Sequence, residues 1–265
     1  MRIDQLLSRA AARIDRLDAE VLLAHLLGRP RLAVLLDQGA EGDAAALAPL
    51  VDRRAAGEPV AYITGHREFW SLDLLVTPDV LIPRPDSETL IEVALAHFGS
   101  RPVHQVLDLG TGSGALLLAA LSQWPSATGI GVDISAAALA VAAANARQLG
   151  FGPRTRFVAG GWGAVSEAFD LILCNPPYVA TGEVLPRDVV DWEPHGALFA
   201  GTDGLDAYRE LAPVIDARLA PGGVACIEIG SGQADPVGAL FGAAGLHVAL
   251  RRDLAGLPRC LIVTK

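Results

Sequence analysis

Two stretches of this sequence combine residue types and spacings that could do chemistry. One is the tetrapeptide Asn175-Pro176-Pro177-Tyr178, which directly follows the apolar run at residues 171–174. The other is the glycine loop, defined as Gly110-Thr111-Gly112-Ser113-Gly114, which follows the largely apolar run at residues 106–109. Both runs predict buried strands of a parallel sheet. Because ligands bind outside the carboxyl ends of such strands, we expect both stretches to border a ligand site.

The glycine loop is typical of a turn that binds a nucleotide-like cofactor. Its glycines allow positive φ angles and a close approach of a ligand to the backbone, and the helix that follows offers free N–H groups. Asp133 ends the next predicted strand, 21 residues after Gly112, where a carboxylate can accept hydrogen bonds from both hydroxyls of a ribose. The pattern fits S-adenosylmethionine and, with Ala115, also the looser fingerprint of NAD-binding proteins. The loop alone therefore leaves the cofactor open.

The tetrapeptide favours methylation of a planar NH₂ nitrogen, whose delocalised lone pair makes it a poor nucleophile. The Asn175 side-chain oxygen and the Pro176 carbonyl can accept both of its N–H bonds. That contact holds the nitrogen in line with a methyl donor and favours a pyramidal transition state. Proline rigidity keeps the carbonyl aimed, and Tyr178 offers a flat wall for a planar group. We expect Asn175, Pro176 and Tyr178 to be catalytic residues of a methyltransferase that uses S-adenosylmethionine.

The elements that must position these residues follow two patterns. Residues 1 to about 57 predict helices, with Asp18 capping one that ends at Gly28 and another running from 43 to 56. Residues 60–84 predict a hairpin linker made of short β-like runs, with a turn at Thr77-Pro78-Asp79. A helix capped by Asp86 or Ser87 follows.

From residue 103 onwards strands and helices alternate. The predicted strands are 103–109, 128–133, 155–159, 171–174, 224–229, 247–251 and 259–263, and the predicted helices are 114–123, 135–149, 204–220 and 232–244. Such alternation predicts a doubly wound, mainly parallel sheet. The last two strands are too close for a crossover helix and should form an antiparallel hairpin at the sheet edge. This α/β fold, with seven strands of which one is reversed, is the architecture of class I methyltransferases.

Composition limits the partners that we expect. The formal net charge is −9 and no block of basic residues is present, so we expect no direct nucleic-acid binding. No apolar run approaches the roughly 20 residues of a membrane span, and the amino terminus lacks a signal-peptide core, so we expect a cytoplasmic protein. We further expect a monomer without a metal site, and we interpret Cys174, Cys226 and Cys260 as buried core residues.

Several phrases along nearly the whole chain carry a resemblance to a known family. They lie at residues 58–65 (Glu-Pro-Val-Ala-Tyr-Ile-Thr-Gly), 67–72 (Arg-Glu-Phe-Trp-Ser-Leu), 81–88 (Leu-Ile-Pro-Arg-Pro-Asp-Ser-Glu), 193–195, 200–205 and 228–230. Together with the glycine loop and the tetrapeptide, they resemble the protein-(glutamine-N5) methyltransferases, and most closely the release factor glutamine methyltransferases. The tetrapeptide alone is shared with DNA adenine methyltransferases, whereas the phrases at 67–72 and 81–88 are much more specific.

The resemblance implies an activity and a division of the chain. Members methylate the side-chain amide nitrogen (N5) of the glutamine in the Gly-Gly-Gln motif of class 1 peptide-chain release factors. The implied parts are an N-terminal helical domain at 1–60 that binds the release factor, a β-hairpin linker at 61–85 and a catalytic domain at 86–265.

The resemblance also implies roles for single residues. S-adenosylmethionine would be held by the glycine loop, Asp133, Trp162 and Asn175, with Trp162 beside the adenine. Asn175 and the other residues of the tetrapeptide (Pro176, Pro177 and Tyr178) would line the glutamine site. Members of the family often have an acidic residue directly before the tryptophan, whereas this chain has Gly161 at that position. A carboxylate contact to the adenine amino group is thus missing from that position.

Other functions stay open on the residues alone. A glutamine methyltransferase acting on a ribosomal protein and an adenine-N6 nucleic-acid methyltransferase share the chemistry. A binding protein without catalysis or an NAD dehydrogenase would share only the loop, and neither explains the tetrapeptide. By position alone, Trp162 is either an adenine contact or a core residue, and Arg84 and Asp86 either border the cleft or begin a helix.

Overall fold

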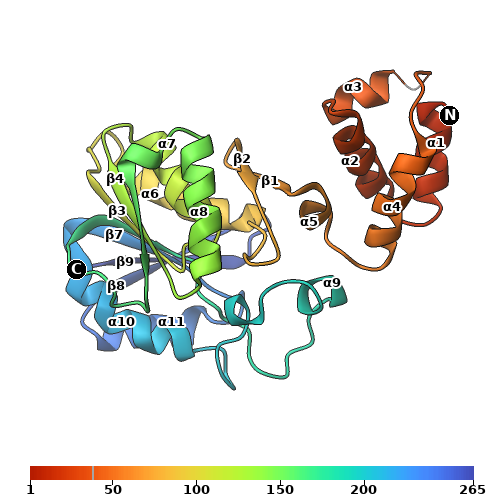
Figure 1. The fold of residues 1–265 in the computed structure, drawn as a ribbon. Helices are drawn as coiled ribbons and strands as arrows, with labels where there is room; N and C mark the ends of the chain where they lie inside the picture. Colours follow the sequence, from red (N-terminus) through yellow and green to blue (C-terminus); the bar gives the residue numbers. More distant parts are fainter. Residues whose placement is uncertain (38) are drawn as a thin grey trace. The chain divides into compact units, whose positions relative to one another are not determined.

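The computed structural model describes residues 1–37 and 39–265, which form two compact units (Figure 1). The first unit comprises Met1–His66 and Leu185–Trp192, and the second comprises Arg67–Val184 and Glu193–Lys265. The division into functional segments at residues 60 and 85 stays a prediction.

The first unit is helical, as the sequence predicts. Its helices are α1 (Ile3–Ala11), α2 (Arg16–Leu27), α3 (Arg31–Leu36), α4 (Ala44–Ala55), α5 (Val60–Thr64) and the short α9 (Arg187–Val190). The predicted cap of α2 was wrong, because the carboxylate of Asp15 accepts the Leu17 N–H at 2.7 Å while Asp18 pairs with Arg54 at 2.6 Å. Gly28 ends this helix with a φ of +59°, as predicted.

The hairpin between the helical segment and the sheet exists, but its turn lies elsewhere than predicted. Strands β1 (His66–Phe69) and β2 (Leu72–Leu75) are joined by Trp70 and Ser71, whose φ angles are +51° and +61°. A two-residue turn with positive φ at both positions matches the twist of a hairpin. Neither residue is a glycine or an asparagine, so the sequence carried no turn signal there. The region at 60–64, predicted as part of the linker, is helix α5.

The second unit contains a seven-stranded sheet with the order β5-β4-β3-β6-β7-β9-β8. The strands are β3 (Gln105–Leu109), β4 (Thr128–Asp133), β5 (Thr155–Ala159), β6 (Phe169–Cys174), β7 (Leu219–Glu228), β8 (His247–Arg252) and β9 (Pro258–Thr264). The strands from β5 to β7 pair in parallel, and β9 runs antiparallel to both of its neighbours. The predicted doubly wound sheet with one reversed strand and a terminal hairpin is therefore confirmed.

Helices cover both faces of this sheet, so its two faces are buried. Figure 1 shows α6 (Glu88–Phe98), α7 (Ala115–Gln123) and α8 (Ala136–Gln148) on one side and α10 (Asp206–Arg218) and α11 (Ala234–Ala243) on the other. Alternate residues of β6 face opposite sides of the sheet. Leu173 packs in the core formed with α6 and α7, and Ile172 packs in the core formed with α10 and α11. Cys174, Cys226 and Cys260 are buried in these cores, as predicted.

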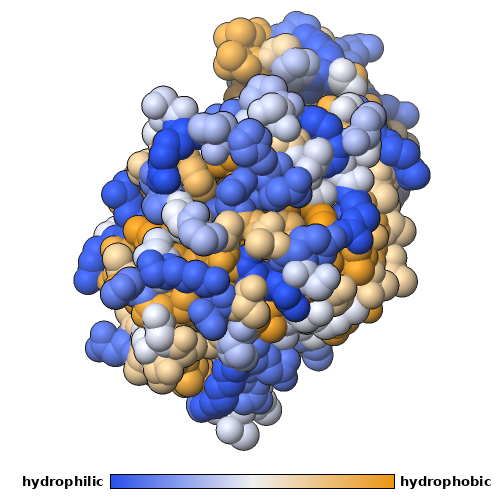
Figure 2. All heavy atoms as spheres, turned by 90° about the vertical axis from the view of Figure 1, so that its left-hand side faces the viewer, coloured by the Kyte–Doolittle hydropathy of each residue, from blue (hydrophilic) through white to orange (hydrophobic). Residues whose placement is uncertain are grey.

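The face of the protein that Figure 2 shows is chemically mixed. On the face seen in Figure 2, groups of hydrophobic side chains are interrupted by hydrophilic ones. Such a mixture is ordinary for a chain with 51% hydrophobic residues, because apolar atoms contribute much of any folded surface.

The strand register brings the sequence motifs to one edge of the sheet. Leu109, the last residue of β3, lies opposite Val132 of β4 and Cys174 of β6. The glycine loop, Asp133 and Asn175 therefore leave the sheet at nearly the same level.

Asn145 of α8 ties the hairpin to the glycine loop. Its Oδ1 accepts the Leu75 N–H at 2.8 Å, and its Nδ2 donates to the carbonyls of Leu75 at 3.0 Å and Ser113 at 2.9 Å. The side chain is fully buried, so these bonds replace all contact with water.

We expect Asn145→Ala to lower the free energy of unfolding by about 2 kcal/mol, because it leaves backbone groups of Leu75 and Ser113 without partners. Urea unfolding measures this loss. Gln148→Ala, at an exposed position of the same helix, is the matched control and should change the free energy by less than about 0.5 kcal/mol. Equal effects of the two substitutions would contradict the role assigned to Asn145.

Candidate active site

A cavity of about 380 Å³ lies at the carboxyl edge of the sheet within the second unit. Its lining includes most residues that the sequence singled out: Gly110, Thr111, Gly112, Ser113, Asp133, Trp162, Asn175 and Pro177. Gly114, Pro176 and Tyr178 do not belong to the lining. The volume lies within the range of about 300–1,000 Å³ that small-molecule and cofactor sites occupy.

The backbone of the glycine loop requires glycine, with φ angles of +71° at Gly110, +51° at Gly112 and +83° at Gly114. A Cβ atom at Gly112 would meet no atom within 4 Å, so the loop is open on that side. A Cβ atom at Gly114 would lie 3.3 Å from the Cβ of Ala142 in α8. Gly112 thus leaves room for a ligand, whereas Gly114 permits close packing of the loop on a helix.

Two carboxylates accept hydrogen bonds from the glycine loop. Asp133 accepts the Gly112 N–H at 2.9 Å through Oδ2 and the Ser135 N–H at 2.9 Å through Oδ1, which holds its carboxylate at the cavity wall with lone pairs to spare. Asp108, which sequence reasoning missed, is buried behind the loop and accepts the Thr111 hydroxyl at 2.6 Å. Burial raises the pKa of Asp108 to about 7.

Trp162 belongs to the core and also borders the cavity, while its expected contact with adenine stays a prediction. The side chain is half-buried and packs against the core between the sheet and α10, and it also lines the cavity. The Trp162 ring lies 3.4 Å from where a Cβ of Gly110 would stand. The ring therefore forms a wall of the cavity directly beside the glycine loop.

Asn175 presents its side-chain oxygen without a protein donor among the described residues. Its Nδ2 donates to the hydroxyl of Ser87 at 3.2 Å, and Ser87 belongs to the short helix η1 (Pro85–Ser87). Both Asn175 and Ser87 line the cavity. The amide can therefore accept a hydrogen bond from a ligand at this point.

Tyr178 is directed away from the lining towards a buried carboxylate. Its hydroxyl donates to Glu228 Oε1 at 3.4 Å, and burial raises its pKa well above the usual range. Its ring packs against the core beneath the sheet. The expected role of Tyr178 as a flat wall for a substrate group stays a prediction.

Comparison with known proteins agrees with this geometry. The model of the PrmC N-terminal domain matches residues 2–65, and that of a methyltransferase domain matches residues 101–218. A release factor glutamine methyltransferase of Rhodospirillum rubrum is 43% identical over 280 residues, covering 99% of this chain and 85% of the relative. One of Bordetella pertussis is 45% identical over 254 residues and covers 93% of both chains.

The chain belongs to the release factor glutamine methyltransferase family. It is accordingly a methyltransferase with the class I fold. The fold extends to distant structures, since a ribosomal protein L11 methylase of Lactobacillus delbrueckii subsp. bulgaricus superposes with a TM-score of 0.53 at 19% identity, over 69% of this chain and 80% of that one.

The family phrase at residues 81–88 contributes cavity residues to which the sequence assigned no firm role. Leu81, Pro83 and Arg84 line the cavity, so Arg84 borders the cleft. Asp86 instead pairs with Arg259 at 3.2 Å and is not part of the lining. The family phrase at residues 81–88 is the sequence signal for these residues, because periodicity alone does not show that a proline-rich segment borders a cavity.

Glu193, from another family phrase, anchors that segment. Its Oε2 accepts the Ile82 N–H at 3.2 Å, and its Oε1 accepts a hydrogen bond from Arg84. The Glu193 side chain is only 1% exposed, so Arg84 is its main charge compensation.

Over residues 1–37 and 39–265, no group of histidine, cysteine, aspartate and glutamate side chains is placed to hold a metal ion. In the same part of the chain, no helix is long and apolar enough to cross a bilayer.

We expect Arg84→Met to lower the free energy of unfolding by about 2 kcal/mol, because it leaves the buried Glu193 carboxylate without its counter-charge. Chemical denaturation monitored by circular dichroism provides the measurement. Arg156→Met removes an ion pair to Glu167 that is about half exposed on both sides, at 54% and 50%, and should cost less than about 1 kcal/mol. A loss for Arg84→Met no larger than that of the control would contradict this assignment.

Proposed function

We propose that this enzyme transfers a methyl group from S-adenosylmethionine to the side-chain amide nitrogen of the glutamine in the Gly-Gly-Gln motif of class 1 peptide-chain release factors. The observation that carries the proposal is the Asn175 amide, which offers its oxygen at a cavity whose other wall is the glycine loop with Asp133. The relatives named release factor glutamine methyltransferase, at 43% and 45% identity, support the choice of substrate.

The residues of the cavity fit S-adenosylmethionine. Gly112 leaves open space at the loop, and the fixed Asp133 carboxylate can accept hydrogen bonds from ribose hydroxyls. Trp162 can contact the adenine ring, and without a carboxylate at Gly161 the adenine amino group depends on other partners. When bound, S-adenosylmethionine supplies an electrophilic methyl group on a positively charged sulfur.

The tetrapeptide holds the nucleophile. In this proposal the Asn175 oxygen and the Pro176 carbonyl accept the two N–H bonds of the substrate amide. Asn175 and Pro177 line the cavity, and Pro176 lies between them in the chain. This contact orients the nitrogen towards the methyl group and strengthens as the nitrogen becomes pyramidal. No protein base is required, because the methylated nitrogen is acidic enough to release its proton to water after transfer.

The N-terminal helical unit is the proposed binding element for the release factor. It matches the PrmC N-terminal domain, and its surface carries the leucines Leu17, Leu32 and Leu36 with exposed fractions of 52%, 67% and 80%. A protein partner can cover such side chains. We further propose a cytoplasmic monomer that does not bind nucleic acid directly, in line with the net charge of −9.

Labelled methyl transfer tests the substrate. We expect label from S-adenosylmethionine on a purified class 1 release factor and none on its variant with Gln→Ala in the Gly-Gly-Gln motif. Label on both proteins would contradict the proposed target. Parallel reactions with ribosomal proteins and with an adenine-containing oligonucleotide show whether a different planar nitrogen is methylated.

Substitutions at the two walls of the cavity should separate catalysis from cofactor binding. Asn175→Ala should lower kcat by 100-fold or more (roughly 3 kcal/mol) by removing a contact that strengthens in the transition state. Asp133→Ala should mainly weaken the affinity for S-adenosylmethionine, by roughly 10-fold for the loss of charge-assisted hydrogen bonds. Steady-state kinetics and isothermal titration calorimetry measure the two effects. Normal turnover of Asn175→Ala at saturating cofactor would contradict the proposed role.

A further inference from the structure

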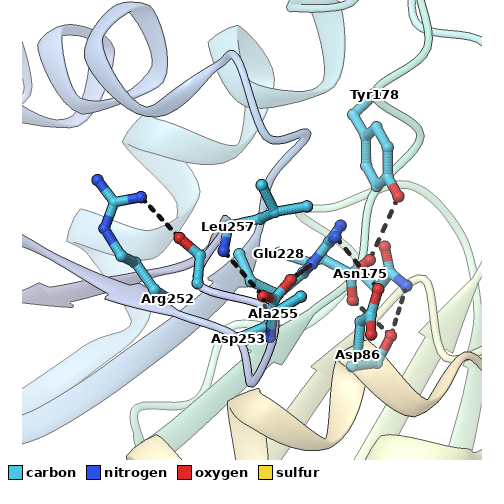
Figure 3. A network of polar contacts seen from close by, with 11 residues as sticks. Asp86, Asn175, Tyr178, Glu228, Arg252, Asp253, Ala255 and Leu257 are labelled. Carbon is cyan, nitrogen blue, oxygen red and sulfur yellow. Dashed lines mark hydrogen bonds and ion pairs between the residues drawn. The ribbon is translucent and has the colours of Figure 1, made fainter.

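A chain of hydrogen bonds runs from Asn175 to a buried carboxylate that the sequence did not indicate. Asn175 Nδ2 donates to Ser87 Oγ at 3.2 Å, and Ser87 Oγ donates to Glu228 Oε2 at 2.5 Å. Tyr178 donates to the other carboxylate oxygen of Glu228 at 3.4 Å. Figure 3 shows Asn175 and Tyr178 from the loop after β6 close to Glu228 at the end of β7, with Asp86 of η1 beside them.

The donor count of this chain determines which way the Asn175 amide faces. An ionised carboxylate only accepts hydrogen bonds, so Ser87 must donate its single hydroxyl proton to Glu228. Towards Asn175, Ser87 can then only accept a hydrogen bond. The NH₂ end of Asn175 must therefore point to Ser87, and the oxygen end is left for the cavity.

The opposite orientation of the amide would be unproductive. A flipped Asn175 would place its NH₂ group where the substrate NH₂ group needs an acceptor, so two donors would face each other. In an open, solvated site both orientations would be populated. Ser87 and Glu228 are 3% and 1% exposed, so water has little access to the bond between them, which fixes the direction of the Ser87 hydroxyl.

Of the charges around Glu228, that of Arg259 favours the ionised, accepting form of the carboxylate and that of Asp86 opposes it. Arg259 lies close enough to stabilise its negative charge and is itself held between Asp86 and Asp253, at 3.2 Å from each. Asp253 in turn accepts the Leu257 N–H at 2.9 Å in the β8–β9 turn (Figure 3). The groups that surround Glu228 are Ser87 and Asp86 from η1, Cys174 and Tyr178 at the end of β6, Tyr208 from α10, and Arg259 and Cys260 from β9.

We propose that Glu228 and Ser87 are positioning residues that hold the Asn175 amide with its oxygen towards the substrate nitrogen. This inference rests on the proposed function, because it assigns the two residues to the same methyl transfer. It adds a requirement that cannot be seen in the tetrapeptide itself: the buried carboxylate of Glu228 must be ionised.

The requirement leads to a pH dependence with a definite sign. Burial raises the pKa of Glu228 to about 7, despite the opposing effects of the Ser87 hydrogen bond and of Arg259. Below that pH the protonated carboxyl can itself donate to Ser87, and the orientation of Asn175 is no longer enforced. The rate should therefore fall as the pH decreases through about 7.

Kinetics of three variants test the proposal. Ser87→Ala should lower kcat about 10-fold or more while the Kd for S-adenosylmethionine changes less than about 2-fold, because only the amide orientation is lost. Ser122→Ala removes a hydroxyl of α7 that bonds to Ala119 and Gln123 of its own helix, and this variant should behave as wild type. Glu228→Gln keeps the side-chain size but cannot titrate, so its kcat should show no fall below pH 7.

A measurement on the free protein separates this inference from the proposed function. The side-chain NH₂ signal of Asn175 in ¹⁵N NMR, assigned with Asn175→Ala, should shift with a midpoint near pH 7 in wild type and not in Glu228→Gln. Absence of methyl transfer to the release factor by wild type would refute the proposed function alone, since the NMR titration needs no substrate.

Three results would overturn the inference. The first is a kcat of Ser87→Ala equal to that of wild type. The second is a pH dependence of kcat in Glu228→Gln equal to that of wild type. The third is an Asn175 NMR signal in wild type that does not shift between pH values below and above 7. Should Ser87→Ala fail to fold by circular dichroism, the pH profile and the NMR titration of Glu228→Gln decide the question.

Discussion

The parallel pairing of β3 with β4 and β6 is the constraint on which the site depends. Because parallel strands keep one direction, their carboxyl ends meet at a common edge, and the register places the last residue of β3 level with Cys174 of β6. The glycine loop, Asp133 and Asn175 come together for this reason although they are separated by up to 65 residues. Helices on both faces bury the sheet and leave this edge for a ligand.

The site is stiffened by polar groups that the fold buries and pairs. Asn145 bonds the hairpin and the loop to α8, Glu193 holds the segment before η1, and Glu228 holds Ser87. Each buried group loses its hydration, which only a complete set of partners can offset. Such networks leave few alternative arrangements, and methyl transfer to a weak nucleophile depends on that restriction.

Sequence reasoning located the parts with strong local signals. The strands β4 and β5 and the reversed strand β9 were predicted because apolar periodicity and glycine spacing are local properties. The hairpin turn at Trp70 and Ser71 was missed, because neither residue type favours a positive φ. The Asp15 cap was missed because Asp18 fits the same helix start equally well. Nor could the sequence show that Arg84 borders the cavity while Asp86, two positions later, pairs with Arg259.

By itself, the sequence determined the fold class and the family, and it led to the chemistry proposed for the tetrapeptide, because these reside in periodicity and in short contiguous motifs. Only the tertiary structure decided what lies behind that motif. Glu228 is 53 residues from Asn175, and in the sequence it stands only within the family phrase at residues 228–230. Its connection through Ser87 arises where η1 and the end of β7 meet beneath the cavity. The strength of this contact depends on burial and on nearby charges such as Arg259, and both are properties of the packed chain rather than of any segment of it.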